Sequence, residues 1–150
     1  MNAKTGKTAA KRKTTSTAAK SKKKVSKGSV VKIEVSLNVN SKPNVVLKTL
    51  NGSNARSMKA SSGDTIEWQV KGTGNNIEMH DLSPTGTGEA FQNKTISNSK
   101  KKLSCEYTPT SSDPNAEFSY TLKVKAGKTT YNTNKPPQPG PQDDKPVIRN

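Results

Sequence analysis

The chain has one histidine and one cysteine, two of the residue types that most often build metal sites and nucleophilic active sites. His80 lies in the run Met79-His80-Asp81, and Cys105 follows further along the chain. A histidine can act as a metal ligand or a general base, and a cysteine becomes a nucleophile when a base or a cation lowers its pKa. His80 would have to meet Cys105 in space to activate it. An exposed histidine at a strand end and a buried strand cysteine are the simpler interpretation, so we expect no catalytic residue and no metal site.

Carboxylates that could work as a general acid and base are Glu67, Glu78 and Glu106. Each alternates with apolar residues, so we expect all three to face water on the outer side of strands. The run Gly72-Thr73-Gly74 lacks the lysine and the helix of a phosphate-binding loop. The sequence therefore predicts a protein that is not an enzyme and has no cofactor.

Cationic residues give the stronger signal. Residues 1–28 contain no acidic residue and supply +10 of the formal net charge of +15, and residues 29–150, with 16 basic and 11 acidic residues, supply +5. A segment so charged and so poor in apolar residues is predicted to be disordered and to attract polyanions. The candidate nucleic-acid-binding residues of this arm are Lys4, Lys7, Lys11, Arg12, Lys13, Lys20, Lys22, Lys23, Lys24 and Lys27.

Lysines of the arm would bind phosphates and release condensed counterions, which gives sequence-independent, salt-sensitive binding to nucleic acid or another polyanion. Lys100, Lys101 and Lys102 either extend this cationic surface onto the folded body at a hairpin or protect an exposed sheet edge. Few aromatic residues are available for stacking on single-stranded bases, so contacts to the backbone are favoured. A solubilising tail without a dedicated partner is the alternative.

The arm resembles two known kinds of basic segment. The pairs Lys11-Arg12 and Lys23-Lys24, separated by residues 13–22 and followed by Lys27, resemble a bipartite nuclear-import signal. The arm as a whole is similar to the Ala/Lys/Thr-rich tails of linker histones and bacterial histone-like proteins. These resemblances imply an intracellular protein, nuclear or nucleoid-associated. No secretory signal and no membrane span are predicted, because no long apolar run is present.

The elements that must position these residues are short strands. Residues 31–39 alternate apolar and polar side chains, as does the run 65–70, which carries the only tryptophan. Residues 81–90 are predicted to be a loop, and no stretch has a sustained helical period. The strands that we predict are 31–39, 45–50, 65–70, 77–80, 91–96, 102–107 and 117–125.

This pattern predicts an all-β fold, an antiparallel Greek-key β-sandwich of about seven strands. We expect a disordered lysine-rich arm over residues 1–28, the β-sandwich domain over 29–131, and a flexible tail over 132–150. The tail includes the proline-rich run 135–141, which cannot pair in a sheet. The single cysteine means that the domain cannot contain an internal disulfide.

The order of several motifs resembles that of cupredoxins and related Greek-key sandwiches, including immunoglobulin-like ones. These motifs are the run 63–68 (Gly-Asp-Thr-Ile-Glu-Trp), a strand ending at His80, then Cys105 and Tyr120. A copper site of the cupredoxin type needs a second histidine and usually a methionine. Neither residue type follows Cys105. The resemblance therefore implies the scaffold of that family without its copper ligands.

The sequence predicts a non-enzymatic, nucleic-acid-associated protein. Its basic arm would bind phosphates, and the β-sandwich would act as an interaction or self-association module, giving a homo-oligomer or a complex with a protein partner. Two other interpretations stay open. One is a structural protein of a virion or assembly, of the capsid or decoration type, and the other is an adhesion-type β-sandwich module.

Overall fold

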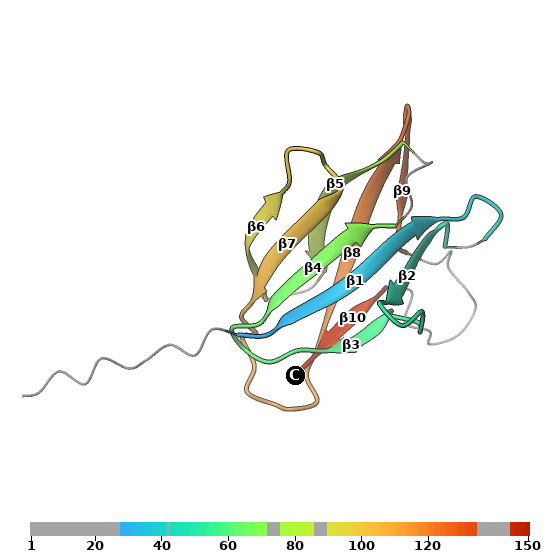
Figure 1. The fold of residues 1–150 in the computed structure, drawn as a ribbon. Coiled ribbons are helices and arrows are strands. Elements are labelled where there is room, and N and C mark those ends of the chain that lie inside the picture. The colour runs from blue at the N-terminus through green and yellow to red at the C-terminus, as the bar shows by residue number, and fades with distance from the viewer. Residues whose placement is uncertain (1–27, 42, 72–75, 86–89, 135–144) are drawn as a thin grey trace, which may run out of the picture.

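The computed structural model describes residues 28–41, 43–71, 76–85, 90–134 and 145–150, which form an all-β body (Figure 1). None of these residues belongs to a helix that could span a membrane. In chain order the strands are β1 Val30–Leu37, β2 Val45–Thr49, β3 Ser57–Lys59, β4 Thr65–Val70, β5 Ile77–Thr85, β6 Phe91–Ile96, β7 Lys102–Tyr107, β8 Glu117–Ala126, β9 Thr129–Asn132 and β10 Val147–Arg149.

The strands form two mixed sheets. Sheet A has the order β2-β1-β4-β7-β6, and sheet B has the order β3-β10-β8-β5, with β9 paired to β8. In sheet A, β1 runs antiparallel to β2 but parallel to β4, with Ile33 opposite Trp68. In sheet B, β10 runs parallel to β3 and antiparallel to β8. The prediction of a purely antiparallel fold is therefore wrong, because each sheet contains one parallel pair of strands.

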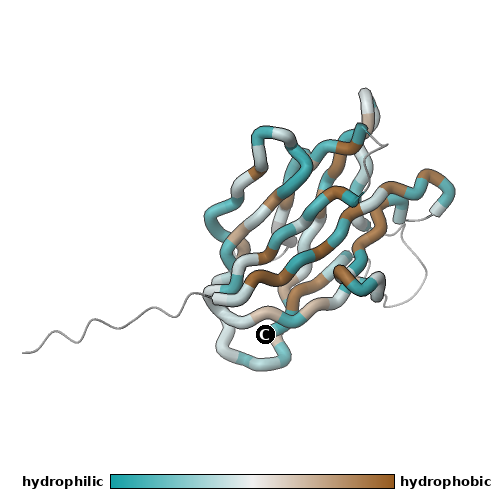
Figure 2. Tube along the Cα trace, in the orientation of Figure 1, coloured by the Kyte–Doolittle hydropathy of each residue, from teal (hydrophilic) through white to brown (hydrophobic). Residues whose placement is uncertain are grey.

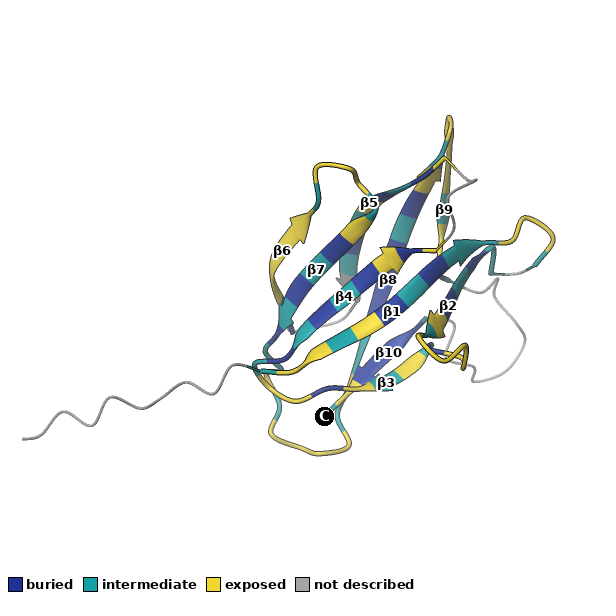
Figure 3. Cartoon of the chain, in the orientation of Figure 1, coloured by how far each residue is buried: buried dark blue, intermediate teal, exposed yellow. Residues whose placement is uncertain are grey.

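Both sheets turn their apolar residues toward one shared core. Along β4 the buried side chains Ile66 and Trp68 alternate with half-buried polar ones, and along β8 Leu122 and Val124 alternate with Lys123 and Lys125. The same alternation of hydropathy and burial runs along the central strands in Figures 2 and 3. The two-residue period of these strands is thus explained by one face packed and one face directed outward.

Aromatic residues from both sheets meet at the centre of this core. The rings of Trp68 and Tyr120 lie 5.3 Å apart between centroids in an edge-on arrangement, and the indole Nε1 donates a hydrogen bond of 3.3 Å to the Tyr120 hydroxyl. Phe91 packs on both of these rings and on Tyr107. Trp68, Phe91, Tyr107 and Tyr120 are called the aromatic cluster below.

Several strands have the predicted bounds, and others differ. Residues 65–70, 91–96 and 102–107 are strands as predicted. β1 ends at Leu37, and Val39 is 62% exposed in the turn that follows. The predicted strand 77–80 continues to Thr85, through part of the predicted loop 81–90, because a shift of register between Met79 and Asp81 lets pairing with β8 resume. The strands β3, β9 and β10 were not predicted.

The predicted boundary at residue 132 is wrong for the end of the chain. Val147–Arg149 forms β10, which lies between β3 and β8 and is hydrogen-bonded to both. Ile148 is 0% exposed in the shared core. The sequence does not reveal this strand because three residues are too few to show an alternation of apolar and polar side chains. Its pairing is determined by the neighbouring strands β3 and β8. The proline-rich run 135–141 lies outside the described residues.

Replacing Ile148 with alanine tests whether the end of the chain belongs to the core. We expect Ile148→Ala to lower the free energy of unfolding by about 2–5 kcal/mol, because it leaves a cavity among fully buried side chains. Arg149→Ala is the control, since it removes only a surface ion pair with Glu117 and should cost about 1 kcal/mol or less. Urea unfolding of both variants makes the comparison. Equal small losses would mean that β10 does not contribute to the core.

The tyrosine of the central hydrogen bond gives a second test. We expect Tyr120→Phe to cost about 1–3 kcal/mol, because it leaves the buried indole N–H of Trp68 without its acceptor. Tyr131→Phe, at a half-buried position of β9, should have a much smaller effect. Thermal or urea unfolding measures both. An unchanged stability of Tyr120→Phe would show that the hydrogen bond does not hold the sheets together.

Candidate nucleic-acid interface

All ten candidate residues of the arm lie outside the described residues, but the structure shows where the arm joins the body. The backbone N–H of Ser29 donates to Oδ1 of Asp64 over 2.8 Å, and the N–H of Ser61 donates to Oδ2 of the same carboxylate over 2.8 Å. The N–H of Thr65 in turn donates to the Ser29 carbonyl. Asp64 is only 8% exposed. The arm therefore starts from a fixed point and not from a loose chain end.

Gly28 is the residue through which the arm enters this contact. A Cβ atom at Gly28 would lie 1.9 Å from the carbonyl oxygen of Gly63, far inside any allowed contact. Only glycine permits such a close approach of two backbones. The predicted boundary between arm and body at residue 28 thus coincides with a backbone contact that tolerates no side chain.

Several chain segments meet at this end of the body. The backbone N–H of Tyr107 donates to the Asp64 carbonyl, and the Tyr107 hydroxyl donates to Oδ1 of Asn150 over 2.9 Å. The N–H of Asn150 donates to the Ala116 carbonyl, next to the start of β8. This region, with Ser29, Asp64, Tyr107, Asn150 and Ala116, is called the junction end. It holds the start of the body and its last residue together.

Lys100, Lys101 and Lys102 lie at the hairpin between β6 and β7, as one of the two interpretations predicted. The interpretation that they protect an exposed sheet edge is wrong for this position. β7 lies inside sheet A, between β4 and β6, so Lys102 is the first residue of an interior strand. The three lysines belong to the end of the body opposite the junction end, where β4 and β8 finish.

Each lysine of this triplet already has a partner. Lys100 Nζ lies 3.4 Å from Glu78 Oε2, and Lys102 Nζ lies 3.3 Å from Glu67 Oε2. Lys101 Nζ donates to the carbonyl of Ile77 over 2.7 Å. Lys100 is 58% exposed at its side chain, and a surface pair of this kind is worth about 1 kcal/mol or less, so phosphate can replace Glu78 there. Phosphate binding by all three lysines stays a prediction.

The backbone of the same triplet joins the two sheets. The N–H of Met79 on β5 donates to the Lys100 carbonyl over 2.6 Å, and the N–H of Val70 on β4 donates to the Lys101 carbonyl over 2.8 Å. Lys94 on β6 adds a bond from its Nζ to the Leu82 carbonyl of β5 over 3.0 Å. The lysine-rich turn is therefore also a structural link between sheet A and sheet B.

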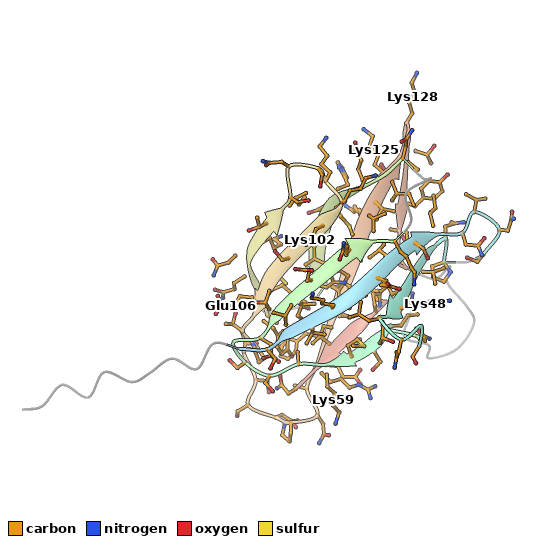
Figure 4. All side chains as sticks on the ribbon, in the orientation of Figure 1. Lys48, Lys59, Lys102, Glu106, Lys125 and Lys128 are labelled. Atoms are coloured by element: carbon orange, nitrogen blue, oxygen red, sulfur yellow. The ribbon has the colours of Figure 1, made fainter. Side chains whose placement is uncertain are left out.

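Two lysines that the sequence analysis did not select lie near this turn. Lys125 is exposed on β8, and Lys128 lies in the turn between β8 and β9; both are at the same end of the body in Figure 4. Lys100 and Lys125 line one surface hollow of about 480 Å³. Lys100, Lys125 and Lys128 are called the distal lysines below. The sequence signal for these lysines is that Lys123 and Lys125 alternate with apolar residues, which indicates outward side chains, and that the turn residues Gly127-Lys128 follow.

His80 and Cys105 have different environments. His80 is exposed and lies within β5, at the register shift beside Met79. The prediction that it lies at a strand end is therefore wrong. Cys105 is 2% exposed and faces the core, and burial raises its pKa to about 12. The prediction of a buried strand cysteine is confirmed. Among the residues that the structure describes, no three His, Cys, Asp or Glu side chains gather into a possible metal site.

The partners of Glu67, Glu78 and Glu106 are residues other than glutamate, so the described contacts do not bring two of them together as a general acid and base. Glu67, only 15% exposed, and Glu78 each lie beside a lysine of the hairpin, and Glu106 accepts a hydrogen bond of 2.9 Å from the Asn93 side chain. The expectation that all three face water is right for Glu78 and only partly right for Glu67. Glu67 and Glu78 therefore match positive charge on the outer faces of the sheets, whereas Glu106 pairs with a neutral amide.

Asp81 behaves in the same way on sheet B. The Ser83 hydroxyl donates to its carboxylate over 2.7 Å, and this bond is the main reason that the pKa of Asp81 is lowered. The backbone of Leu82 and the nearby charges of Lys123 and Lys94 act in the same direction. Asp81 therefore stays ionised and neutralises Lys123, 3.8 Å away.

Comparisons with known proteins do not add to this picture. A scan against protein-family models and a search of curated proteins both gave no match to the chain. Inference about function therefore rests on the distribution of charge and on the geometry of the two ends of the body.

The buried thiol predicts how stability depends on pH. The unfolded thiol loses its proton near pH 9.0, whereas native Cys105 keeps its proton to about pH 12. Because the native state then binds more protons than the unfolded state, the free energy of unfolding falls as pH rises above 9, by at most about 1.4 kcal/mol per pH unit from this group.

Urea unfolding between pH 7 and pH 10 measures this effect. We expect Cys105→Ala to show a shallower decline above pH 9 than the wild type, whatever its stability at pH 7. Ser104→Ala, on the neighbouring residue of β7, should keep the slope of the wild type. Identical slopes for all three proteins would contradict the assignment.

Proposed function

We propose that this protein is a non-enzymatic, nucleic-acid-associated protein that binds the phosphate backbone through its lysine-rich arm. The observation that carries the proposal is the partition of charge: residues 1–28 supply +10 of the net +15 and contain no acidic residue. Ten cations in so short a segment attract a polyanion without regard to its base sequence. An intracellular location, nuclear or nucleoid-associated, follows from the same proposal.

The junction supports a division of labour between arm and body. Ser29 is held by Asp64 and Gly28 lies against Gly63, so the arm is attached at one end of the body. The arm lysines have no acidic neighbour in sequence, in contrast to Lys100 and Lys102, which lie beside Glu78 and Glu67. The arm is therefore the stronger of the two phosphate-binding segments proposed.

The body is proposed to be a Greek-key β-sandwich of the cupredoxin-like or immunoglobulin-like kind that acts as an interaction or self-association module. Two observations support this: both sheets share one core, and sheet A is open, with β2 and β6 as its outer strands. An outer strand can pair with a strand of a partner or of a second copy. Homo-oligomers and protein complexes are both compatible with this role.

A structural protein of a virion or other assembly is the second candidate. It is favoured by the combination of a basic arm, which would hold a packaged genome, with an all-β body that would form a shell. Sedimentation that shows large, regular particles would favour this candidate over the first. An adhesion-type module is the third, and it would require the protein to be found outside the cell.

Neutralising the arm in the full chain tests the leading proposal. In the test variant, all ten basic residues of residues 1–28 are changed to glutamine. We expect duplex DNA binding at low salt to be lost in this variant. For the wild type, log affinity should fall with log salt at a slope of about −9 if all ten residues engage phosphates. Fluorescence titration over a range of salt concentrations measures both.

A permuted arm of the same composition is the matched control. It should bind as the wild type does, because the interaction depends on charge and not on order. Binding that is unchanged in the glutamine variant would overturn the proposal. Equal affinity for duplex DNA, single strands and heparin would reduce the partner to polyanions in general.

A further inference from the structure

We propose that the distal lysines Lys100, Lys125 and Lys128 form a second phosphate-binding surface, and that one molecule thereby joins two segments of nucleic acid. The inference rests on the proposed function of the arm and extends it from binding to bridging. It depends on where the lysines lie on the body and on how few acidic groups lie beside them.

The distal lysines lie far from the point where the arm joins. Ala116 at the junction end directly precedes β8, and Lys125 is near the other end of this strand. β8 has 10 residues, which at 3.3 Å per residue span about 30 Å. Charges so far apart are screened from each other by salt, since the Debye length is about 8 Å at physiological ionic strength. The two ends can therefore bind separate segments.

The distal end has more positive than negative charge. Glu78 is the one acidic residue among those lining the hollow, and it lies between Lys100, its ion-pair partner, and Lys125, which is opposite it across the β5–β8 ladder. Lys128 lies in the next turn and extends away from the body in Figure 4. Two lysines thus face one exposed carboxylate, and a third extends from the neighbouring turn.

Three other lysines of the outer faces each lie beside one carboxylate. Lys71 pairs with Glu34, Lys102 with Glu67, and Lys123 with Asp81. A phosphate that approached these positions would compete with a carboxylate already in place. At the distal end two of the three lysines remain after Glu78 has neutralised one. Lys48 and Lys59 likewise have no ion pair among the described residues, but they lie on different strands, β2 and β3, and on other sides of the body (Figure 4), whereas Lys100 and Lys125 line one hollow.

The shape of the distal end suits a phosphate group. The hollow between the β6–β7 turn and β5 has a volume of about 480 Å³, and the polar side chains Ser97, Asn98 and His80 line it beside Lys100 and Lys125. Lysine ammonium groups bind phosphate as point charges with rotatable donors, so they need no fixed bidentate geometry. Nucleic acid is the partner that repeats such groups along a chain.

A two-duplex capture assay with the full chain tests the inference. A tethered DNA duplex is saturated with protein, and a fluorescent duplex is then added across a range of salt concentrations. The test variant is Lys125→Gln/Lys128→Gln. The matched control is Lys48→Gln/Lys59→Gln, which removes the same charge from two exposed positions on other sides of the body (Figure 4).

We expect all three proteins to bind the tethered duplex through the arm. Capture of the second duplex should fall in the distal variant, and its dependence on log salt should weaken by about 1.8, as expected for two lost phosphate contacts. The control should capture as the wild type does. Equal urea-unfolding midpoints would show that each protein is folded.

Three results would overturn the inference while leaving the function of the arm in place. They are a wild type that binds the first duplex but captures no second one, a distal variant that captures as much as the wild type, and a control that loses as much as the distal variant. A glutamine arm variant that still binds one duplex, and loses it on Lys125→Gln/Lys128→Gln, would instead overturn the role of the arm and keep the distal surface.

Discussion

The contact between the Trp68 indole and the Tyr120 hydroxyl is the constraint on which the rest of the body depends. It joins sheet A to sheet B at the centre of the aromatic cluster, where burial also raises the pKa of the Tyr120 hydroxyl. With one cysteine in the chain, no internal disulfide can take over this task. Packing of Phe91 and Tyr107 against the same pair fixes how the sheets face each other, and so fixes the positions of both ends.

Polar contacts then specialise the two ends. At the junction end, the buried Asp64 carboxylate accepts the backbone N–H groups of Ser29 and Ser61 and so joins both residues to the start of β4. At the distal end, the carbonyls of Lys100 and Lys101 accept bonds from β5 and β4. The lysine backbone is thus used for structure while the side chains remain near the surface. This explains how one short turn can be both a link between sheets and part of a charged surface.

The sequence predicted strands well where one face is buried, and poorly where pairing is decided by the rest of the fold. Residues 65–70 show the two-residue period because Ile66, Trp68 and Val70 all enter the core. Val147–Arg149 is too short to show a period, and its burial follows from β3 and β8 on either side. The arm was visible from composition. For Lys125, the alternation along β8 indicates an outward side chain, but it does not indicate that the fold places β8 beside the turn that carries Lys100.

Ion pairs make several lysines on the sheet faces less available to a polyanion than the unpaired lysines at the ends of the body. On sheet A, Lys71 and Lys102 are matched by Glu34 and Glu67, so a phosphate gains either of these two cations only by displacing a carboxylate and leaving it beside the polymer. Repulsion from that carboxylate offsets the gain. At the distal end, Lys128 needs no such exchange, and the arm has no carboxylate to displace. A fold alone does not specify a function, but this placement of unmatched charge does favour one kind of partner.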